Sequence, residues 1–125
     1  HLAREKNIEI RQEFDTDSLP VTGDYGRLRQ MILIVLDNAV KFSPAGSEIW
    51  ISLNNRTVSI SDQGNGIAEE DLPHIFDRFY KVVSEENKSG SGLGLAIAKQ
   101  IADRHHIGVA VTSKLNEGTK FQFEF

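Results

Sequence analysis

The chain has 125 residues, of which 39% are hydrophobic and 26% are charged, so it is long enough to fold unaided as one globular domain that buries roughly two thirds of its unfolded surface. Its net charge of −4 argues against a nucleic-acid partner, and its lack of cysteine excludes disulfides and thiolate metal sites. The longest strongly apolar run, residues 31–36, is too short to cross a membrane, and the amino terminus has no signal-peptide pattern, so we expect a cytoplasmic domain.

The first third of the chain predicts a strand and a long helix. Residues 7–14 alternate apolar with charged side chains, which is typical of a half-buried strand, and we place this strand at a sheet edge. Asp24 is a good N-cap for a helix whose apolar residues recur at helical spacing as far as Phe42. Pro44 should end this helix, because proline disfavours helical geometry in the residue before it.

Two β-hairpins are predicted further along the chain. Residues 48–53 and 57–61 place apolar side chains on one face on either side of an Asn-Asn turn. Residues 109–111 and 121–125 alternate in the same way around an Asn-Glu-Gly turn. Together with the first strand, these segments predict five strands.

A second helix is expected between the two hairpins, at residues 95–105, where an apolar stripe recurs at helical spacing. The polar segment 82–90 has no period, and we interpret it as a mobile loop. The predicted fold is a mixed sheet covered on one face by helices.

Asn38, Lys41 and Phe42 form the first group of candidate site residues. On a helix they share one face near the carboxyl end, because they stand at positions i, i+3 and i+4. An amide oxygen is a suitable ligand for Mg²⁺, an ammonium group pairs with phosphate, and an aromatic ring can cover a base. The same three residues also fit an ordinary helix end, in which the Lys41 charge interacts with the negative end of the helix dipole and Phe42 lies in the core. That alternative stays open.

Asp62 opens the second group, directly after the strand predicted to end at Ser61. A carboxylate at a strand end can accept the exocyclic amine of adenine, and Gly64 and Gly66 let the backbone approach a base closely. Guanine has an oxygen in place of that amine, so one carboxylate can select the base. A calcium-like or ordinary turn is the alternative, because aspartate and glycine are common turn formers, and the motif alone is only moderately specific.

The third feature is the glycine-rich segment 90–95, which leads into the second predicted helix. Free backbone amides at a helix start bind phosphate oxygens, and the helix dipole favours them. The segment is neither a dinucleotide-binding fingerprint nor a P-loop, because its glycine spacing differs and the P-loop lysine is missing. Leu93 and Leu95 favour a shaped loop over the alternative of a flexible linker, because their side chains require burial.

In this order and spacing, the motifs resemble the histidine-kinase catalytic domains of the gyrase, chaperone, kinase and mismatch-repair ATPase superfamily. The resemblance covers nearly the whole chain. The segments that carry it are the asparagine box 38–42, the first glycine box 62–67, the F box 76–80, the second glycine box 90–97, the Gly118-Thr119 pair and the leader 19–24. It implies the Bergerat fold, an α/β two-layer sandwich in which a mixed, about five-stranded sheet packs against three helices, with an ATP lid over residues 67–92.

The resemblance also implies roles for the matching residues. Asn38 would hold Mg²⁺ and act in catalysis with Lys41, Phe42 would flank the base, and Asp62 would read the adenine amine. The other residues expected around the nucleotide are Gly64, Gly66, Ile67, Tyr80, Lys81, Gly92, Leu93, Gly94, Leu95 and Thr119. The basic lid residues available to the γ-phosphate are Arg78, Lys81 and Lys88, and we do not rank them. Phe76 and Phe79 would pack the lid and contact the partner domain, or belong to a minor core, with equal weight.

The activity implied by the resemblance is that of a protein-histidine kinase, which binds Mg-ATP and donates the γ-phosphate to a histidine in two-component signal transduction. Ile34 departs from the pattern, since many relatives carry Asn or Glu four residues before Asn38, and an isoleucine can neither activate water nor bind metal. We therefore expect poor ATP hydrolysis. A gyrase-type or chaperone-type ATPase, a noncatalytic nucleotide-binding module and a serine kinase remain as alternatives.

None of the four histidines has the sequence context of a phosphoacceptor, which is an acidic residue and then a proline close behind. We therefore expect residues 1–125 to be a catalytic fragment that serves a separate histidine-bearing dimerisation domain, with a response regulator downstream, in a membrane-anchored bacterial sensor kinase. The adjacent pair His105 and His106 points in two directions from a helix, so a capping or packing role is favoured over metal binding.

Overall fold

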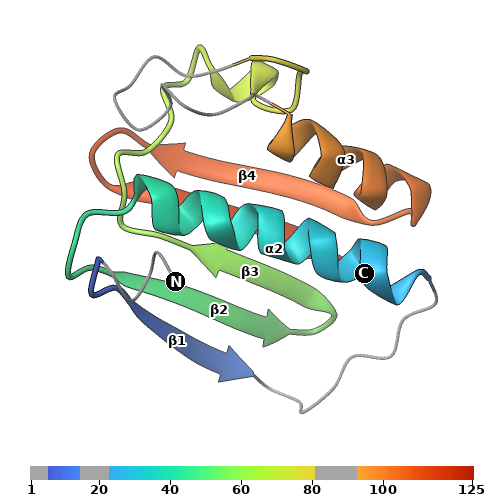
Figure 1. Cartoon of the computed structure of the whole chain (residues 1–125), viewed down its shortest axis with the longest axis horizontal. Helices are drawn as coiled ribbons and strands as arrows, with labels where there is room; N and C mark the ends of the chain where they lie inside the picture. The colour runs from blue at the N-terminus through green and yellow to red at the C-terminus, as the bar shows by residue number, and fades with distance from the viewer. Residues whose placement is uncertain (1–5, 15–22, 81–92) are drawn as a thin grey trace.

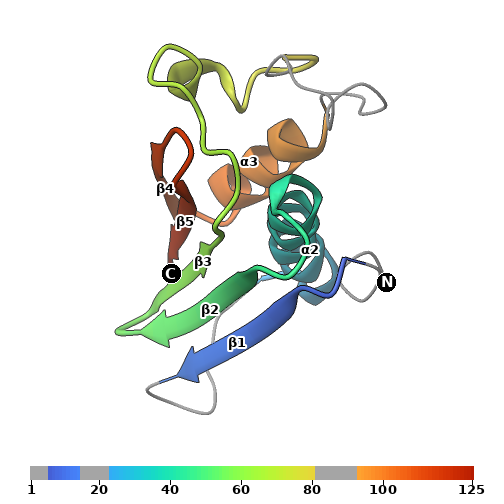
Figure 2. The ribbon, with the colours of Figure 1, turned by 90° about the vertical axis from the view of Figure 1, so that its left-hand side faces the viewer.

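The computed structural model describes residues 6–14, 23–80 and 93–125, which form a two-layer α/β sandwich (Figure 1). Helices α2 (Tyr25–Phe42) and α3 (Gly94–Arg104) lie on one face of a five-stranded sheet with the order β1-β2-β3-β5-β4 (Figure 2). The strands are β1 (Glu9–Phe14), β2 (Glu48–Asn54), β3 (Thr57–Ser61), β4 (Gly108–Lys114) and β5 (Gly118–Glu124). The predicted fold class is confirmed, although the described residues contain two α-helices and the 3₁₀ turn η1 (Leu72–His74) where three helices were expected.

Strand β1 lies at the sheet edge, as predicted, and runs parallel to β2, whereas the other neighbouring strands are antiparallel. The expectation that this strand is half-buried was wrong. Ile8, just before β1, is buried, but Ile10 and Phe14 are 38% and 49% exposed. The reason is that α2 packs on β3 and α3 on β4, so the helical layer does not cover the far end of β1.

Both predicted hairpins are present. In the first, Asn55 and Arg56 have φ values of +50° and +63°, the left-handed pair that a two-residue turn between twisted strands requires. In the second, β4 pairs with β5 along its length, from Gly108 opposite Glu124 to Lys114 opposite Gly118. This second hairpin forms the other edge of the sheet and approaches the segment that follows β3.

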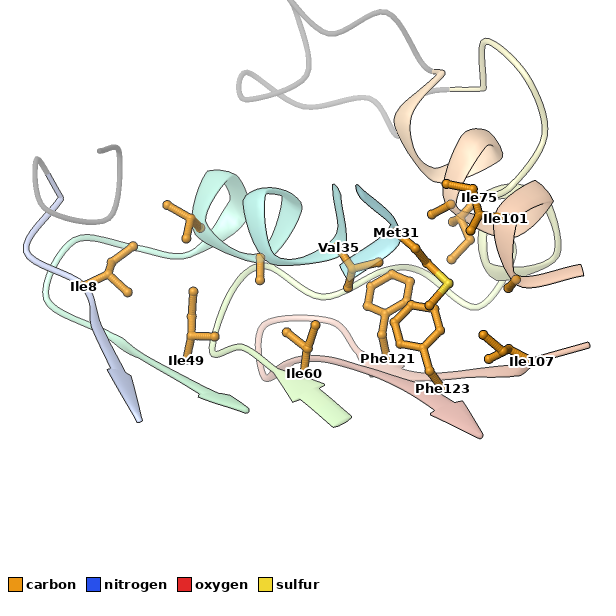
Figure 3. Close-up of a cluster of buried hydrophobic side chains, with 14 residues drawn as sticks. Ile8, Met31, Val35, Ile49, Ile60, Ile75, Ile101, Ile107, Phe121 and Phe123 are labelled. Carbon is orange, nitrogen blue, oxygen red and sulfur yellow. The ribbon is translucent and has the colours of Figure 1, made fainter. Parts of the chain in front are cut away.

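The core lies between the sheet and the two helices (Figure 3). Met31 and Val35 of α2 have no exposed surface, and Phe123 of β5 is only 1% exposed. Burial of apolar side chains on this scale is the main source of stability in a domain of this size. None of the helices in the described part of the chain is long and apolar enough to span a membrane.

The amino-terminal end of α2 is joined to the carboxyl-terminal end of α3 through His105. Asp24 caps α2, because its Oδ1 accepts a hydrogen bond from Arg27 N at 3.1 Å. The backbone N–H of Asp24 donates to His105 Nε2 at 3.1 Å, and His105 Nδ1 donates to Ile101 O at 2.9 Å. Because Nε2 accepts and Nδ1 donates in these two bonds, His105 has the contacts of a capping residue, which was one of the two roles predicted for it.

We expect His105→Phe to lower the free energy of unfolding by about 1–2 kcal/mol, because the ring volume is kept while two hydrogen bonds are lost. Urea denaturation measures this difference. His106→Asn is the matched control, since His106 is exposed with a φ of +57° that asparagine tolerates, and it should change the stability by less than about 0.5 kcal/mol. Equal unfolding midpoints for wild type and His105→Phe would show that the histidine does not join the helices.

Candidate functional site

One face of α2 borders the start of α3 and carries the first group of candidate residues. Asn38, Lys41 and Phe42 are all half-buried near the carboxyl end of α2, as their spacing predicted. Ile34 lies one turn before Asn38 on the same face, and a methyl group added at Gly94 would stand 3.5 Å from its Cγ2. The carboxyl half of α2 and the glycine at the start of α3 are therefore neighbours.

Lys41 and Phe42 also contact each other, because Lys41 Nζ lies 5.3 Å from the centre of the Phe42 ring. An ammonium group at this distance from an aromatic face is held by a cation–π attraction of about 0.5–1 kcal/mol at an exposed site. A contact of this strength costs little to exchange for a contact with an anion.

Asp62 stands directly after β3 and is tied to β5 by two hydrogen bonds, one from its backbone and one to its side chain. Its N–H donates to Thr119 O at 2.9 Å, and Thr119 N donates to Asp62 Oδ1 at 3.2 Å. The same Oδ1 accepts a hydrogen bond from Gly64 N at 2.8 Å. Burial raises the pKa of the Asp62 carboxyl above its usual value, and the amides of Gly64 and Thr119 oppose that shift by stabilising the charged form.

The loop after β3 is held in place by the β4–β5 hairpin. Ser113 Oγ accepts a hydrogen bond from Ile67 N at 2.7 Å, donates to Gly118 O at 3.0 Å and lies 2.8 Å from Thr119 Oγ1. A hydroxyl group has one proton and two lone pairs, so these three contacts can all be satisfied when Thr119 donates to Ser113. The hairpin thus fixes both ends of the segment that carries Gly64 and Gly66.

Two glycines of this loop are required by their surroundings. A methyl group at Gly64 would lie 2.4 Å from Phe42 O, which is shorter than any real contact, so the loop passes directly against the end of α2. Gly66 has a φ of +75°, and a methyl group there would stand 2.0 Å from Lys114 O. The backbone after Asp62 is therefore packed between α2 on one side and the second hairpin on the other.

The N-cap residue of α3 supplies no capping side chain. Leu93 occupies the N-cap position without a side-chain hydrogen bond, although its carbonyl accepts from Ile97 N at 3.0 Å. Leu95, in the first turn of α3, is half-buried and packs against the core, as a shaped loop requires. Lys81, Lys88 and Gly92, together with the predicted mobile loop, lie outside the described residues.

The first part of the expected lid, residues 67–80, is ordered by local contacts. Tyr80 donates its hydroxyl hydrogen bond to Asp71, and its ring stacks on His74 with 5.3 Å between ring centres. Phe76 packs edge-on against Phe121 of β5 at 6.3 Å, whereas Phe79 is 69% exposed. The two phenylalanines of the F box thus differ. Phe76 packs against the core, which fits the alternative of a core role, whereas Phe79 faces solvent.

The described residues bring most of the predicted site together. Contacts run from Gly94 to Ile34, along α2 to Phe42, across to Gly64 and on to Asp62 and Thr119.

Sequence reasoning missed Ser113. The available signal was a serine on the apolar face of β4, two residues after Val111, but alternation alone does not identify its partners.

Comparison with known proteins agrees with this geometry. Residues 23–125 match the family model described as "Histidine kinase-, DNA gyrase B-, and HSP90-like ATPase". The sensor histidine kinase YkoH of Bacillus subtilis is 43% identical over 94% of this chain and 27% of its own length. The adaptive-response sensory kinase SasA of Gloeothece citriformis is 37% identical over 96% of this chain and 32% of its own length. The chain belongs to the histidine kinase-, DNA gyrase B- and HSP90-like ATPase family.

Solved structures place it among the sensor histidine kinases of that family. The mycobacterial kinase MprB superposes with a TM-score of 0.81 at 31% identity, covering 98% of this chain and 84% of that one. The catalytic domain of ThkA superposes with a TM-score of 0.79 at 28% identity, covering 97% and 79%. Full-length ShkA in complex with AMPPNP has a TM-score of 0.80 at 31% identity, covering 98% of this chain and 26% of that one. The resemblance seen in the sequence motifs is thus confirmed.

The raised pKa of Asp62 predicts how stability depends on pH. Because this pKa lies above the value of about 3.8 for an unperturbed aspartate, the ionised group lowers stability at neutral pH, and the cost disappears as pH falls through the folded pKa. Asp62→Asn keeps an oxygen that can accept both amides but does not titrate. The stability of wild type relative to this variant should therefore rise between neutral pH and about pH 4. Urea-unfolding free energies across this range measure it, and a relative stability that falls on acidification would contradict the assignment.

Gly66→Ala should lower the unfolding free energy by about 2 kcal/mol or more, because alanine disfavours the left-handed backbone and the new methyl group meets a fixed carbonyl. Gly26→Ala in α2 is the matched control, since its methyl group would find nothing closer than Asp24 Oδ1 at 3.4 Å. This control should be neutral or stabilise by up to about 1 kcal/mol. Thermal unfolding compares the two variants, and equal losses would mean that the loop is not held against the hairpin.

Proposed function

We propose that this chain is the ATP-binding catalytic domain of a sensor histidine kinase, holding Mg-ATP for transfer of the γ-phosphate to a histidine on a separate dimerisation domain. The observation that carries this proposal is the environment of Asp62. A half-buried carboxylate, held by the amides of Gly64 and Thr119, stands where the ends of β3 and α2 meet the second hairpin.

Adenine recognition would use the second oxygen of Asp62. Both amides bond to Oδ1, and within residues 6–14, 23–80 and 93–125 no group donates to Oδ2, which can accept the exocyclic amine. GTP would present an oxygen there and leave the carboxylate unpaired, at a cost of about 1–3 kcal/mol. Phe42 would flank the base, and Thr119 would support it through Asp62 or water. Gly64, Gly66, Ile67 and Tyr80 would complete the adenine side of the pocket.

The triphosphate would extend from the base along α2 toward the start of α3. Asn38 would supply its amide oxygen to Mg²⁺, and Lys41 would leave the Phe42 ring for a phosphate oxygen. The described residues contain no group of three or more His, Cys, Asp or Glu side chains that could hold a metal ion alone. Mg²⁺ shared between one amide and phosphate oxygens fits this donor set, because Mg²⁺ is usually bound through few protein ligands together with substrate phosphates.

The backbone amides at the start of α3 would receive the outer phosphates, and Leu93, Gly94 and Leu95 would shape this end of the pocket together with Gly92. Lys81, Lys88 and Arg78 supply the positive charge of the lid in the proposal. The AMPPNP bound to ShkA supports an adenosine triphosphate as the ligand of this chain as well.

Phosphoryl transfer to histidine is favoured over hydrolysis by Ile34. This side chain lies against the start of α3, one turn from Asn38, and has no group that could take a proton from water. In the transfer, a nitrogen of the acceptor imidazole bonds to the γ-phosphorus while the bond to the β,γ-bridging oxygen breaks, and ADP leaves. The proton of the imidazole passes to a base on the histidine-bearing domain. The ATP-binding domain itself therefore contributes positioning and charge stabilisation.

The acceptor histidine would come from outside this chain. His74 contacts Asp77 and Tyr80, and His105 joins the two helices, so both have other roles in the structure. Because the curated relatives are three to four times longer than the matched region, the histidine-bearing domain of the same kinase would be the partner. A response regulator would act downstream, and the domain would lie in the cytoplasm as part of a membrane-anchored sensor.

The test mixes this domain with a cognate histidine-bearing domain and ATP labelled at the γ-phosphate. We expect acid-labile label on the partner histidine, and Asn38→Ala should reduce its rate at least about tenfold by weakening the Mg²⁺ site. Gln100→Ala, which removes an exposed amide side chain from α3, is the control and should leave the rate unchanged.

Three other outcomes would overturn the proposal. Sustained phosphate release by the isolated domain, indifferent to the partner, would indicate a gyrase-type or chaperone-type ATPase. Acid-stable label would indicate a serine kinase. Nucleotide binding without any labelled partner would indicate a noncatalytic nucleotide-binding module.

A further inference from the structure

The carboxyl-terminal end of α2 is held by a side chain from outside the helix. Lys6 Nζ donates hydrogen bonds to Val40 O at 3.1 Å, to Lys41 O at 2.8 Å and to Ser43 O at 3.1 Å. An ammonium group has three donors, so this lysine is fully satisfied by the helix end. The positive charge also stands at the negative end of the helix dipole, where cations are favoured.

The main chain around Lys6 is anchored as well. Lys6 O accepts a hydrogen bond from Gly46 N at 3.0 Å, and Glu9 N donates to Ser47 O at 3.1 Å as β1 begins. Lys6 is half-buried, and Asn7 takes a left-handed φ of +57° between it and the strand. The chain that enters β1 is therefore fastened by backbone and side chain to the turn that ends α2.

That turn is part of the candidate nucleotide site. Lys41 provides one of the bonded carbonyls, and the next carbonyl, of Phe42, is the one against which Gly64 packs. Gly64 in turn donates to Asp62 Oδ1 at 2.8 Å. A continuous series of contacts thus leads from Lys6 to the carboxylate that would read adenine.

We propose that Lys6 is a positioning residue for the nucleotide site, through which the chain entering β1 sets the affinity of the domain for Mg-ATP. The inference rests on the proposed function. A coupling of this kind is reciprocal: if the Lys6 contact favours the nucleotide-binding arrangement of Lys41, Phe42 and Gly64, then bound nucleotide strengthens the Lys6 contact by the same factor.

Lys6→Met tests the proposal, because methionine keeps most of the aliphatic length and removes the charge with all three donors. Calorimetry on the intact domain, at a temperature where wild type and variant are both folded, should show Mg-ATP affinity at least about fivefold weaker in the variant. Lys99→Met is the control, since the contact of Lys99 in the described part of the chain is an exposed ion pair with Asp103 within α3, and the affinity of this variant should equal that of wild type. A folded Lys6→Met domain with unchanged affinity would overturn the proposal.

Hydrogen exchange of wild type provides the second measurement and decides the matter if Lys6→Met does not fold. Saturating Mg-ATP should slow exchange at the amides of Gly46 and Glu9 by at least about fivefold, because both belong to the anchored entry segment. Unaltered exchange there, with nucleotide bound, would overturn the coupling and leave the proposed function intact. If wild type binds no adenine nucleotide at all, the proposed function fails first, so the two failures are distinguishable.

Discussion

The structure depends on one pair of hydrogen bonds, which two backbone amides from different segments donate to Asp62 Oδ1. A half-buried carboxylate is costly to ionise, and the amides of Gly64 and Thr119 supply the compensation that keeps it in place. The same contacts close the loop after β3 onto β5. A single side chain thereby serves both the local fold and the chemistry proposed for it, because the second oxygen, to which none of the described residues donates, is the one left for a ligand.

Helix α2 is positioned at both ends by residues far away in the chain. At one end His105 accepts a hydrogen bond from the backbone N–H of the N-cap residue, and at the other Lys6 donates to the last carbonyls. Between these ends the helix packs through fully buried Met31 and Val35. Phosphoryl transfer demands alignment to within fractions of an ångström, and a helix fixed in three places can hold Asn38 and Lys41 in a defined relation to a loop on another element.

How much of the fold and of the candidate site can be predicted depends on what each sequence pattern encodes. Periodicity located both helices and all five strands, because the spacing of apolar residues reflects which face is buried. It failed for the exposure of β1, since alternation identifies a face without showing whether a helix covers it. The ordered motifs predicted the candidate site, but the contacts of Ser113 with Ile67 and of Lys6 with Lys41 join residues 46 and 35 positions apart. No local rule relates such pairs, because only the folded topology brings them together.

The central claim is that Asp62 and the amides around it read the adenine ring. The most direct measurement follows the backbone amide signals of Gly64 and Thr119 by nuclear magnetic resonance while Mg-ATP or Mg-GTP is added. The account predicts that both signals move with ATP, saturate at the affinity of the nucleotide, and move little with GTP at the same concentrations. Signals that stay in place while ATP binds elsewhere, or that respond equally to the two nucleotides, would contradict it.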